Sequence, residues 1–179
     1  MIIAAVRDDP AYLQKGTEIC GEVLLPALAL TTDNYALENL VWQILKQATF
    51  KARYFYYSTM LTHTYLSSPQ MLAKQIQVFR HIGKWARRLE TDQIKQKSRA
   101  LTKPASGNAI IAFARIVADA KAYDNQIEPL IMAISLCQDL SLDIMAFTIM
   151  KHLADATTRP LDSSGDIAPW LQNLSEFAA

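Results

Sequence analysis

The stretch SPQMLAKQIQVFRHIGKWARRL, residues 68–89, decides the fold class. Ser68 can cap the free backbone N–H groups at the start of a helix, and Pro69 at the first helical position loses no hydrogen bond. Apolar residues follow at helical spacing, which predicts a long amphipathic helix with one face turned inward. We expect that inward face to carry Leu72, Ile76, Phe79, Ile82, Ala86 and Leu89.

Helical signals continue on the N-terminal side of this stretch. Asp33 is expected to cap a helix that ends near Leu45, because apolar residues recur between them at helical spacing. Residues 50–65 carry bulky side chains on one stripe, and we expect this stripe to be core rather than a platform for stacking bases. Tyr56 is expected to be the exposed aromatic of this segment. The stripe consists of Phe50, Tyr54, Tyr57, Leu61 and Tyr65.

Helical signals also continue on the C-terminal side. Thr91 is expected to start a short polar helix that Pro104 ends, and Ser106 or Asn108 to open the next one. Ser141 is expected to cap a later helix. The residues that we expect to face inward in that later helix are Leu142, Met145, Ile149 and Leu153.

The scarcity of turn-forming residues between these segments favours an all-α fold. The chain has only five glycines and contains no Asn-Gly or Asp-Gly turn, which argues against hairpins. Eight or nine helices with short connections are too many for one four-helix bundle, so we predict an irregular α-solenoid of stacked antiparallel helix pairs, of the HEAT or armadillo kind. We expect N-terminal helices over residues 1–34, and a helical-repeat segment over 35–179 that continues beyond the apolar C-terminus.

Composition excludes several classes of protein. The chain of 179 residues has a net charge of +1, 51% hydrophobic residues and 20% charged residues, which is typical of a globular protein. Two cysteines rule out a disulfide scaffold and a four-cysteine zinc site. The longest apolar run, residues 23–30, is interrupted by Pro26 and is far shorter than the ~20 residues of a membrane span, so we expect no membrane partner.

The charged residues are unevenly distributed along the chain. The segment 46–103 holds twelve Lys and Arg against Glu90 and Asp92, a net charge of +10, and the remainder carries −9. A block of this kind can attract a polyanion or an acidic partner. The cations that we expect to form one surface are Arg80, Lys84, Arg87, Arg88, Lys95, Lys97, Arg99 and Lys103.

Three interpretations of this surface stay open at the level of sequence. It can be an ordinary solvated helix face, a groove for the RNA backbone, or an interface with another protein. The RNA interpretation predicts binding that weakens steeply with salt and does not depend on base sequence.

Residues suited to catalysis or metal binding show no functional spacing. His63, His81 and His152 are scattered, and Cys137 lies on an apolar stripe as a small buried hydrophobe would. We expect Asp143 to lie in the first turn of its helix, where a carboxylate meets the positive end of the helix dipole. We therefore predict no catalytic residues, no cofactor, no metal site and no enzymatic activity.

Several motifs resemble a known family, and they occur in the family's order. These are Leu40–Leu45, Arg87-Arg88-Leu89, Lys95–Leu101, Tyr123–Leu130, Leu140–Ala146 and Ile167–Phe177. Over about residues 35–179 the chain resembles the family of the large scaffold subunit (subunit 2) of the THO complex, as an internal fragment. That complex is a nuclear assembly that couples transcription to mRNA export.

The resemblance implies a structural and non-enzymatic function. Similar proteins form an α-solenoid backbone that organises the other THO subunits and the DEAD-box RNA helicase of the export machinery, in the nucleus. On this reading the partners are those subunits, the helicase and possible RNA cargo. The alternative that the residues leave open is a direct RNA-binding helical module that uses the basic face 80–103.

Overall fold

The computed structural model describes residues 10–31, 34–89, 94–155 and 157–179, and these form helices and their connections. None of the described helices is both long and apolar enough to cross a membrane. The first helices are α2 (Pro10–Ile19), a π-helical turn (Cys20–Leu24), α3 (Leu25–Leu30), α4 (Tyr35–Leu45), α5 (Phe50–Thr62) and α6 (Pro69–Ala86). They are followed by α7 (Ile94–Ala122), α8 (Ile127–Ile134), α9 (Asp139–Leu153) and α10 (Pro169–Ala178).

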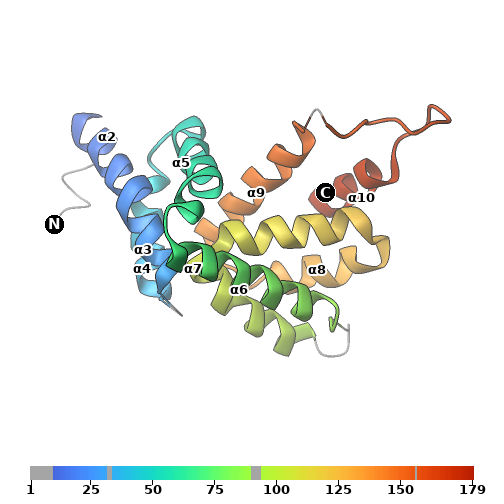
Figure 1. The fold of residues 1–179 in the computed structure, drawn as a ribbon, viewed down its shortest axis with the longest axis horizontal. Coiled ribbons are helices and arrows are strands. Elements are labelled where there is room, and N and C mark those ends of the chain that lie inside the picture. The colour runs from blue at the N-terminus through green and yellow to red at the C-terminus, as the bar shows by residue number, and fades with distance from the viewer. Residues whose placement is uncertain (1–9, 32–33, 90–93, 156) are drawn as a thin grey trace.

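Helix α7 is the central element of the fold. It packs against α6, α8, α9 and α10, and its middle also meets α3 and α5. Figure 1 shows α2–α4 at one end of the molecule, α8 and α10 towards the other, and α6 and α7 running side by side between them. The all-α prediction is confirmed. The stacked-pair solenoid stays a prediction, with which this packing is compatible.

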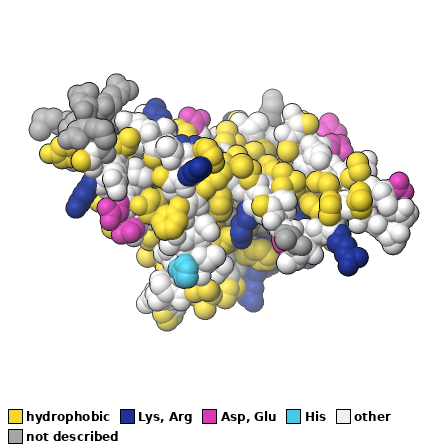
Figure 2. All heavy atoms as spheres, turned by 90° about the horizontal axis from the view of Figure 1, so that it is seen from above, with side chains coloured by type: hydrophobic (Ala, Val, Ile, Leu, Met, Phe, Trp, Pro, Cys, Tyr) yellow, Lys and Arg dark blue, Asp and Glu magenta, His cyan; other side chains and the backbone are white. Residues whose placement is uncertain are grey.

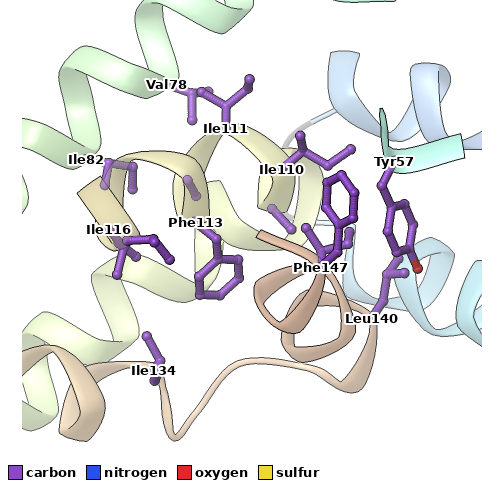
Figure 3. Packing of buried hydrophobic residues seen from close by; sticks show 14 of the residues in the cluster. Tyr57, Val78, Ile82, Ile110, Ile111, Phe113, Ile116, Ile134, Leu140 and Phe147 are labelled. Carbon is purple, nitrogen blue, oxygen red and sulfur yellow. The ribbon is translucent and has the colours of Figure 1, made fainter. Parts of the chain in front are cut away.

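The core surrounds the second half of α7. Ile110, Ile111, Phe113, Ile116 and Val117 are buried there, and they meet apolar side chains from α6, α8 and α9 (Figure 3). Because both sides of this half-helix are apolar, it is covered by neighbours on nearly its whole circumference. The second half of α7 therefore holds the helices of the molecule together.

Helix α6 begins as predicted, and its predicted inward face is confirmed at Ile82 and Ala86 but not in the first half of the helix. The Ser68 hydroxyl accepts a hydrogen bond from the Met71 N–H at 3.3 Å, which confirms the predicted cap. The buried residues of this helix are Met71, Val78, Ile82, Trp85 and Ala86. Leu72, Ile76 and Phe79, which we expected to face inward, are 40–43% exposed. Both sets have helical spacing, so periodicity alone could not decide which one faces α7.

Two predicted caps are wrong. Asn34 caps α4, because its side-chain oxygen accepts from the Leu37 N–H at 3.0 Å, and Asp33 lies outside the described residues. Helix α9 starts at Asp139 after Gln138, and Ser141 is buried inside it.

The earlier start of α9 also changes its inward face. The buried residues are Leu140, Ser141, Ile144, Phe147 and Thr148, and the predicted inward residue Leu153 is 49% exposed. The Phe147 ring packs edge-on against the Tyr54 and Tyr57 rings of α5, with centroids 5.2 and 5.7 Å apart. These aromatic contacts fix the rotation of α9.

Asp143 joins α9 to α5 instead of stabilising a helix start. Its two carboxylate oxygens each accept from the Arg53 guanidinium at 2.9 Å, and the Tyr57 hydroxyl donates to one of them at 2.9 Å. A bidentate pair with little exposure is strong and geometrically specific. Arg53 is therefore a structural cation, although it lies in the positively charged segment 46–103.

Pro104 does not end its helix. Helix α7 continues through it, and the backbone leaves helical geometry at Asn108, whose φ is −134° and ψ is 44°. The predicted start of a new helical segment is therefore confirmed at Asn108 and not at Ser106. The side chain of Asn108 is buried and bonded at both ends: its oxygen accepts from the Tyr65 hydroxyl at 3.1 Å, and its nitrogen donates to the Ala29 carbonyl at 3.0 Å. The neighbouring Gly107 lets α3 approach closely, because a Cβ there would lie 3.1 Å from the Leu28 carbonyl oxygen.

Replacing Asn108 with alanine should destabilise the protein by about 2–3 kcal/mol, because the change leaves the Tyr65 hydroxyl and the Ala29 carbonyl without their partner. Urea unfolding followed by circular dichroism measures the change in the free energy of unfolding. Asn125→Ala, at an exposed position, is the control. An Asn108→Ala protein as stable as this control would show that the kink does not depend on the amide.

Glu38 on α4 is the most unusual carboxyl group of the core. It is 1% exposed, and its Oε1 accepts from the Ser141 hydroxyl at 2.7 Å. Its Oε2 has no hydrogen-bond partner among the described residues. Burial raises the pKa of Glu38 to about 7. The folded protein therefore binds a proton that the unfolded chain, with a glutamate pKa of about 4.3, has released.

Stability should consequently fall as the pH rises from about 5 to 8, by about 2 kcal/mol for this group. Glu38→Gln keeps a neutral side chain and should be more stable than the parent at pH 8 but not at pH 5. Thermal unfolding at both pH values tests this, with Glu128→Gln as a control at an exposed carboxylate. An equal stability difference at both pH values would refute the assignment of a protonated Glu38.

Candidate functional site

A groove lined by cations runs between α6 and the first half of α7. It consists of two adjoining hollows, of about 390 and 530 Å³, which share His81 and Ala100 as lining residues. We call it the basic groove. Its Lys and Arg residues are Lys74 and Lys84 from α6, Arg88 from the turn after α6, and Lys97, Arg99 and Lys103 from α7.

A hydrogen bond joins the two walls of the groove. The Trp85 indole N–H donates to the Lys97 carbonyl oxygen at 2.9 Å, and the indole is buried. Pro104 lies about two turns further along the same wall and has no N–H to donate to the carbonyl of Ala100, which also lines the groove. The walls are therefore two joined helices that carry the cationic side chains.

The charged residues that line the described part of the groove are all basic. No Asp or Glu is among its described lining residues. Lys84, Arg88 and Arg99 are exposed, and so is His81 at the junction of the two hollows. Like charges gathered in a concave surface raise the local positive potential, which concentrates anions.

The structure divides the cations that we grouped by sequence. Lys84, Arg88, Lys97, Arg99 and Lys103 line the basic groove, as expected for one surface. Arg80 instead borders a hollow on the opposite side of α6.

The other two predicted cations do not line the basic groove. The Arg87 side chain donates from Nε to the Gly83 carbonyl of its own helix at 3.1 Å. The side chain of Lys95 lies outside the part of the chain that the structure describes. The prediction of one continuous face is therefore wrong for Arg80 and Arg87.

Two groove residues were missed by the sequence analysis. Lys74 and His81 stand seven residues apart, and Arg88 follows after another seven. Seven residues are close to two full helical turns, so these three side chains share one side of α6. This spacing could have identified Lys74 and His81 as groove residues from the sequence alone.

The opposite side of α6 carries a second hollow, which we call the apolar groove. Leu61, Ile76, Phe79, Ile111 and Ala114 line about 350 Å³ between α5, α6 and α7. The Arg115 guanidinium lies 5.0 Å from the centre of the Phe79 ring and pairs with Asp119 at 2.8 Å. Figure 2 shows the face of the molecule that is seen from above, where hydrophobic side chains are also exposed.

The aromatic segment of α5 is mainly structural. Tyr57 and Tyr65 are buried, which agrees with the predicted core stripe, whereas Phe50 is 53% exposed. Phe55 is also exposed, at 63%, whereas the prediction for Tyr56 is wrong, because its ring occupies the space left by the absent side chain of Gly21. None of these rings lines the basic groove.

The described residues contain no group of three or more His, Cys, Asp or Glu that could hold a metal ion. Burial raises the pKa of the Cys20 thiol to about 11 and that of Cys137 to about 12, so both are protonated at neutral pH. Cys137 is half-buried rather than fully buried. His152 is half-buried beside Lys121, and burial lowers its pKa.

Comparison with known proteins covers nearly the whole chain. Residues 3–99 match the family model described as THO complex subunit 2 N-terminus, and residues 101–175 match the model described as Transcription- and export-related complex subunit. The first match includes most of residues 1–34, in which the sequence analysis recognised no resemblance. The two matches meet inside α7.

Individual relatives are similar over the same range. The THO complex subunit 2 of Homo sapiens is 28% identical over 160 residues, which are 89% of this chain and 10% of that protein. The Arabidopsis thaliana and Saccharomyces cerevisiae proteins of the same name are 27% and 23% identical, over 89% and 93% of this chain. The chain spans about a tenth of the length of these curated relatives.

Trp85→Phe should loosen the first half of α7, because phenylalanine fills most of the space but cannot donate to the Lys97 carbonyl. We expect a loss of about 1 kcal/mol in stability and faster amide hydrogen exchange over residues 96–103. Trp170→Phe is the matched control, because it removes the indole bond to the Arg159 carbonyl at the far end of the molecule. Equal exchange in both variants over residues 96–103 would contradict the role of Trp85.

Proposed function

Because this chain belongs to the family of THO complex subunit 2, we propose that it is a structural scaffold segment of the nuclear THO complex. In this role it helps to organise the other THO subunits and the DEAD-box RNA helicase for mRNA export coupled to transcription. It acts without catalysing a reaction. The observation that carries the proposal is the pair of family matches that together extend from residue 3 to residue 175.

The architecture supports a role in assembly. A central helix packed on nearly all sides gives a firm body, and such a body can present several surfaces at fixed relative positions. The apolar groove is one such surface, because Ile76 and Phe79 are large apolar side chains that remain more than 40% exposed.

The proposed occupant of the apolar groove is a helix of another THO subunit, with an apolar stripe and acidic residues beside it. The groove offers apolar side chains at its floor, and Arg80 at its border carries a positive charge. Helices bind such grooves through residues spaced three and four apart. The groove itself thus supports a contact with protein.

Changing Ile76 and Phe79 to aspartate should remove at least one subunit from the complex, because charged side chains cannot be buried against an apolar helix. Affinity purification of the tagged full-length scaffold from cells, followed by quantitative mass spectrometry of the subunits and the helicase, measures the loss. Leu40→Asp with Leu136→Asp is the matched control, since these side chains are 52% and 50% exposed elsewhere.

A deletion of residues 35–179 tests the scaffold proposal as a whole. Retention of every subunit and of the helicase after this deletion would overturn it. Retention after the Ile76 and Phe79 changes alone would remove only the apolar groove from the interface. Fluorescence imaging of the tagged protein in the same cells tests the proposed nuclear location.

A further inference from the structure

We infer that the basic groove binds the phosphate backbone of single-stranded RNA. This inference goes beyond the scaffold function and does not depend on it, because it is based on the shape and charge of one groove. It assigns to the segment a direct contact with nucleic acid in addition to contacts with protein.

The arrangement of the cations fits a linear polyanion. Lys74, Lys84 and Arg88 line one wall, and Lys97, Arg99 and Lys103 line the other. From Lys74 to Lys84 the α6 wall is about 15 Å long, at 1.5 Å per residue, and Arg88 extends it beyond the end of the helix. A strand lying along this length can meet cations from both walls. A small anion would use only one of the two hollows.

The width of the groove favours a single strand over a duplex. Its walls are two directly packed helices joined by the Trp85–Lys97 hydrogen bond, and packed helices lie only about 8–10 Å apart between axes. A duplex could touch the rims of such a groove but could not enter it. A flexible single strand can bring its phosphates to side chains on both walls.

The groove lacks the features that a folded acidic protein would need. Protein interfaces depend on large apolar or aromatic side chains that insert into pockets, and the large apolar residues of this groove, Val78 and Trp85, are only 5% and 7% exposed. Apart from the small Ala100, the exposed lining residues that the structure describes are charged or polar. Among the described lining residues no Phe or Tyr occurs and the Trp85 ring is buried, so bases find few stacking partners and binding should depend only weakly on base sequence.

The chain provides a matched pair of charge-reversal variants. The groove variant combines Lys84→Glu, Arg88→Glu and Arg99→Glu, all at exposed positions in the basic groove. The control combines Lys51→Glu, Arg80→Glu and Arg87→Glu, none of which lines that groove. Both variants change the net charge by the same amount, so any difference between them reports position rather than total charge.

The experiment is a fluorescence anisotropy titration of a labelled 15-nucleotide polyuridine with the purified chain, at salt concentrations from 50 to 200 mM. We expect the parent to bind with an affinity that falls steeply with salt, at a slope of about −0.7 per phosphate contact. The groove variant should bind at least tenfold more weakly, and the control within about threefold of the parent. A blunt RNA duplex of the same length should bind more weakly than the single strand.

Several results would overturn the inference. Equal losses in the two variants would show a diffuse effect of net charge, and absence of binding by the parent at 50 mM salt would show that the groove does not recognise RNA. A labelled polyglutamate peptide that binds the parent more tightly than polyuridine, and loses binding only in the groove variant, would assign the groove to an acidic protein instead. Circular dichroism of all three proteins confirms that the comparisons are made between folded chains.

Discussion

The buried side-chain amide of Asn108 is the contact that the arrangement of the other helices depends on. It satisfies the Tyr65 hydroxyl on one side and the Ala29 carbonyl on the other, and it does so at the one position where α7 leaves helical geometry. A buried polar side chain is tolerated only when its donors and acceptors are used, so the amide holds α3 and the segment after α5 at fixed places beside the kink. Because the amide is at the kink, it also sets the angle between the two halves of α7.

Because of the kink, the two halves of α7 lie in different parts of the structure. The second half of α7 is apolar on most sides and forms the centre of the core, whereas the first half carries Lys97, Arg99 and Lys103 and forms a wall of the basic groove. Helix α6 spans both regions and turns its buried face, through Val78 and Ile82, towards α7. As a result, the basic groove and the apolar groove lie on opposite sides of α6. A chain of this design can offer a charged surface and an apolar surface to two different partners at once.

Sequence patterns predicted the helices much better than they predicted their orientation. The number and approximate limits of the helices follow from hydrophobic period, from Ser68-Pro69 and from the scarcity of glycine. Orientation failed where two apolar stripes compete on one helix, as Leu72–Ile76–Phe79 and Met71–Val78 do on α6, because only the neighbouring helix decides between them. Pro104 and Ser141 were misassigned for a similar reason: long-range contacts allowed α7 to continue through a proline, and they gave the Ser141 hydroxyl a partner in Glu38. The sequence predicted the cations of the basic groove as one helix face. That Arg80 and Arg87 do not line the groove could be seen only once the position of α7 was known.

The placement of ion pairs separates structural charges from charges that remain free to bind a ligand. Arg53 and Arg115 are held by Asp143 and Asp119, and both of these pairs stabilise contacts within the body of the molecule. Lys84, Arg88 and Arg99 in the basic groove form no ion pair with a described carboxylate, so their mutual repulsion opposes folding and must be offset by the core of α6 and α7. A bound polyanion would relieve this repulsion, because it would supply the negative charges that the surrounding protein does not. The loss of stability caused by this repulsion and the proposed binding of RNA would therefore both arise from the same uncompensated charge.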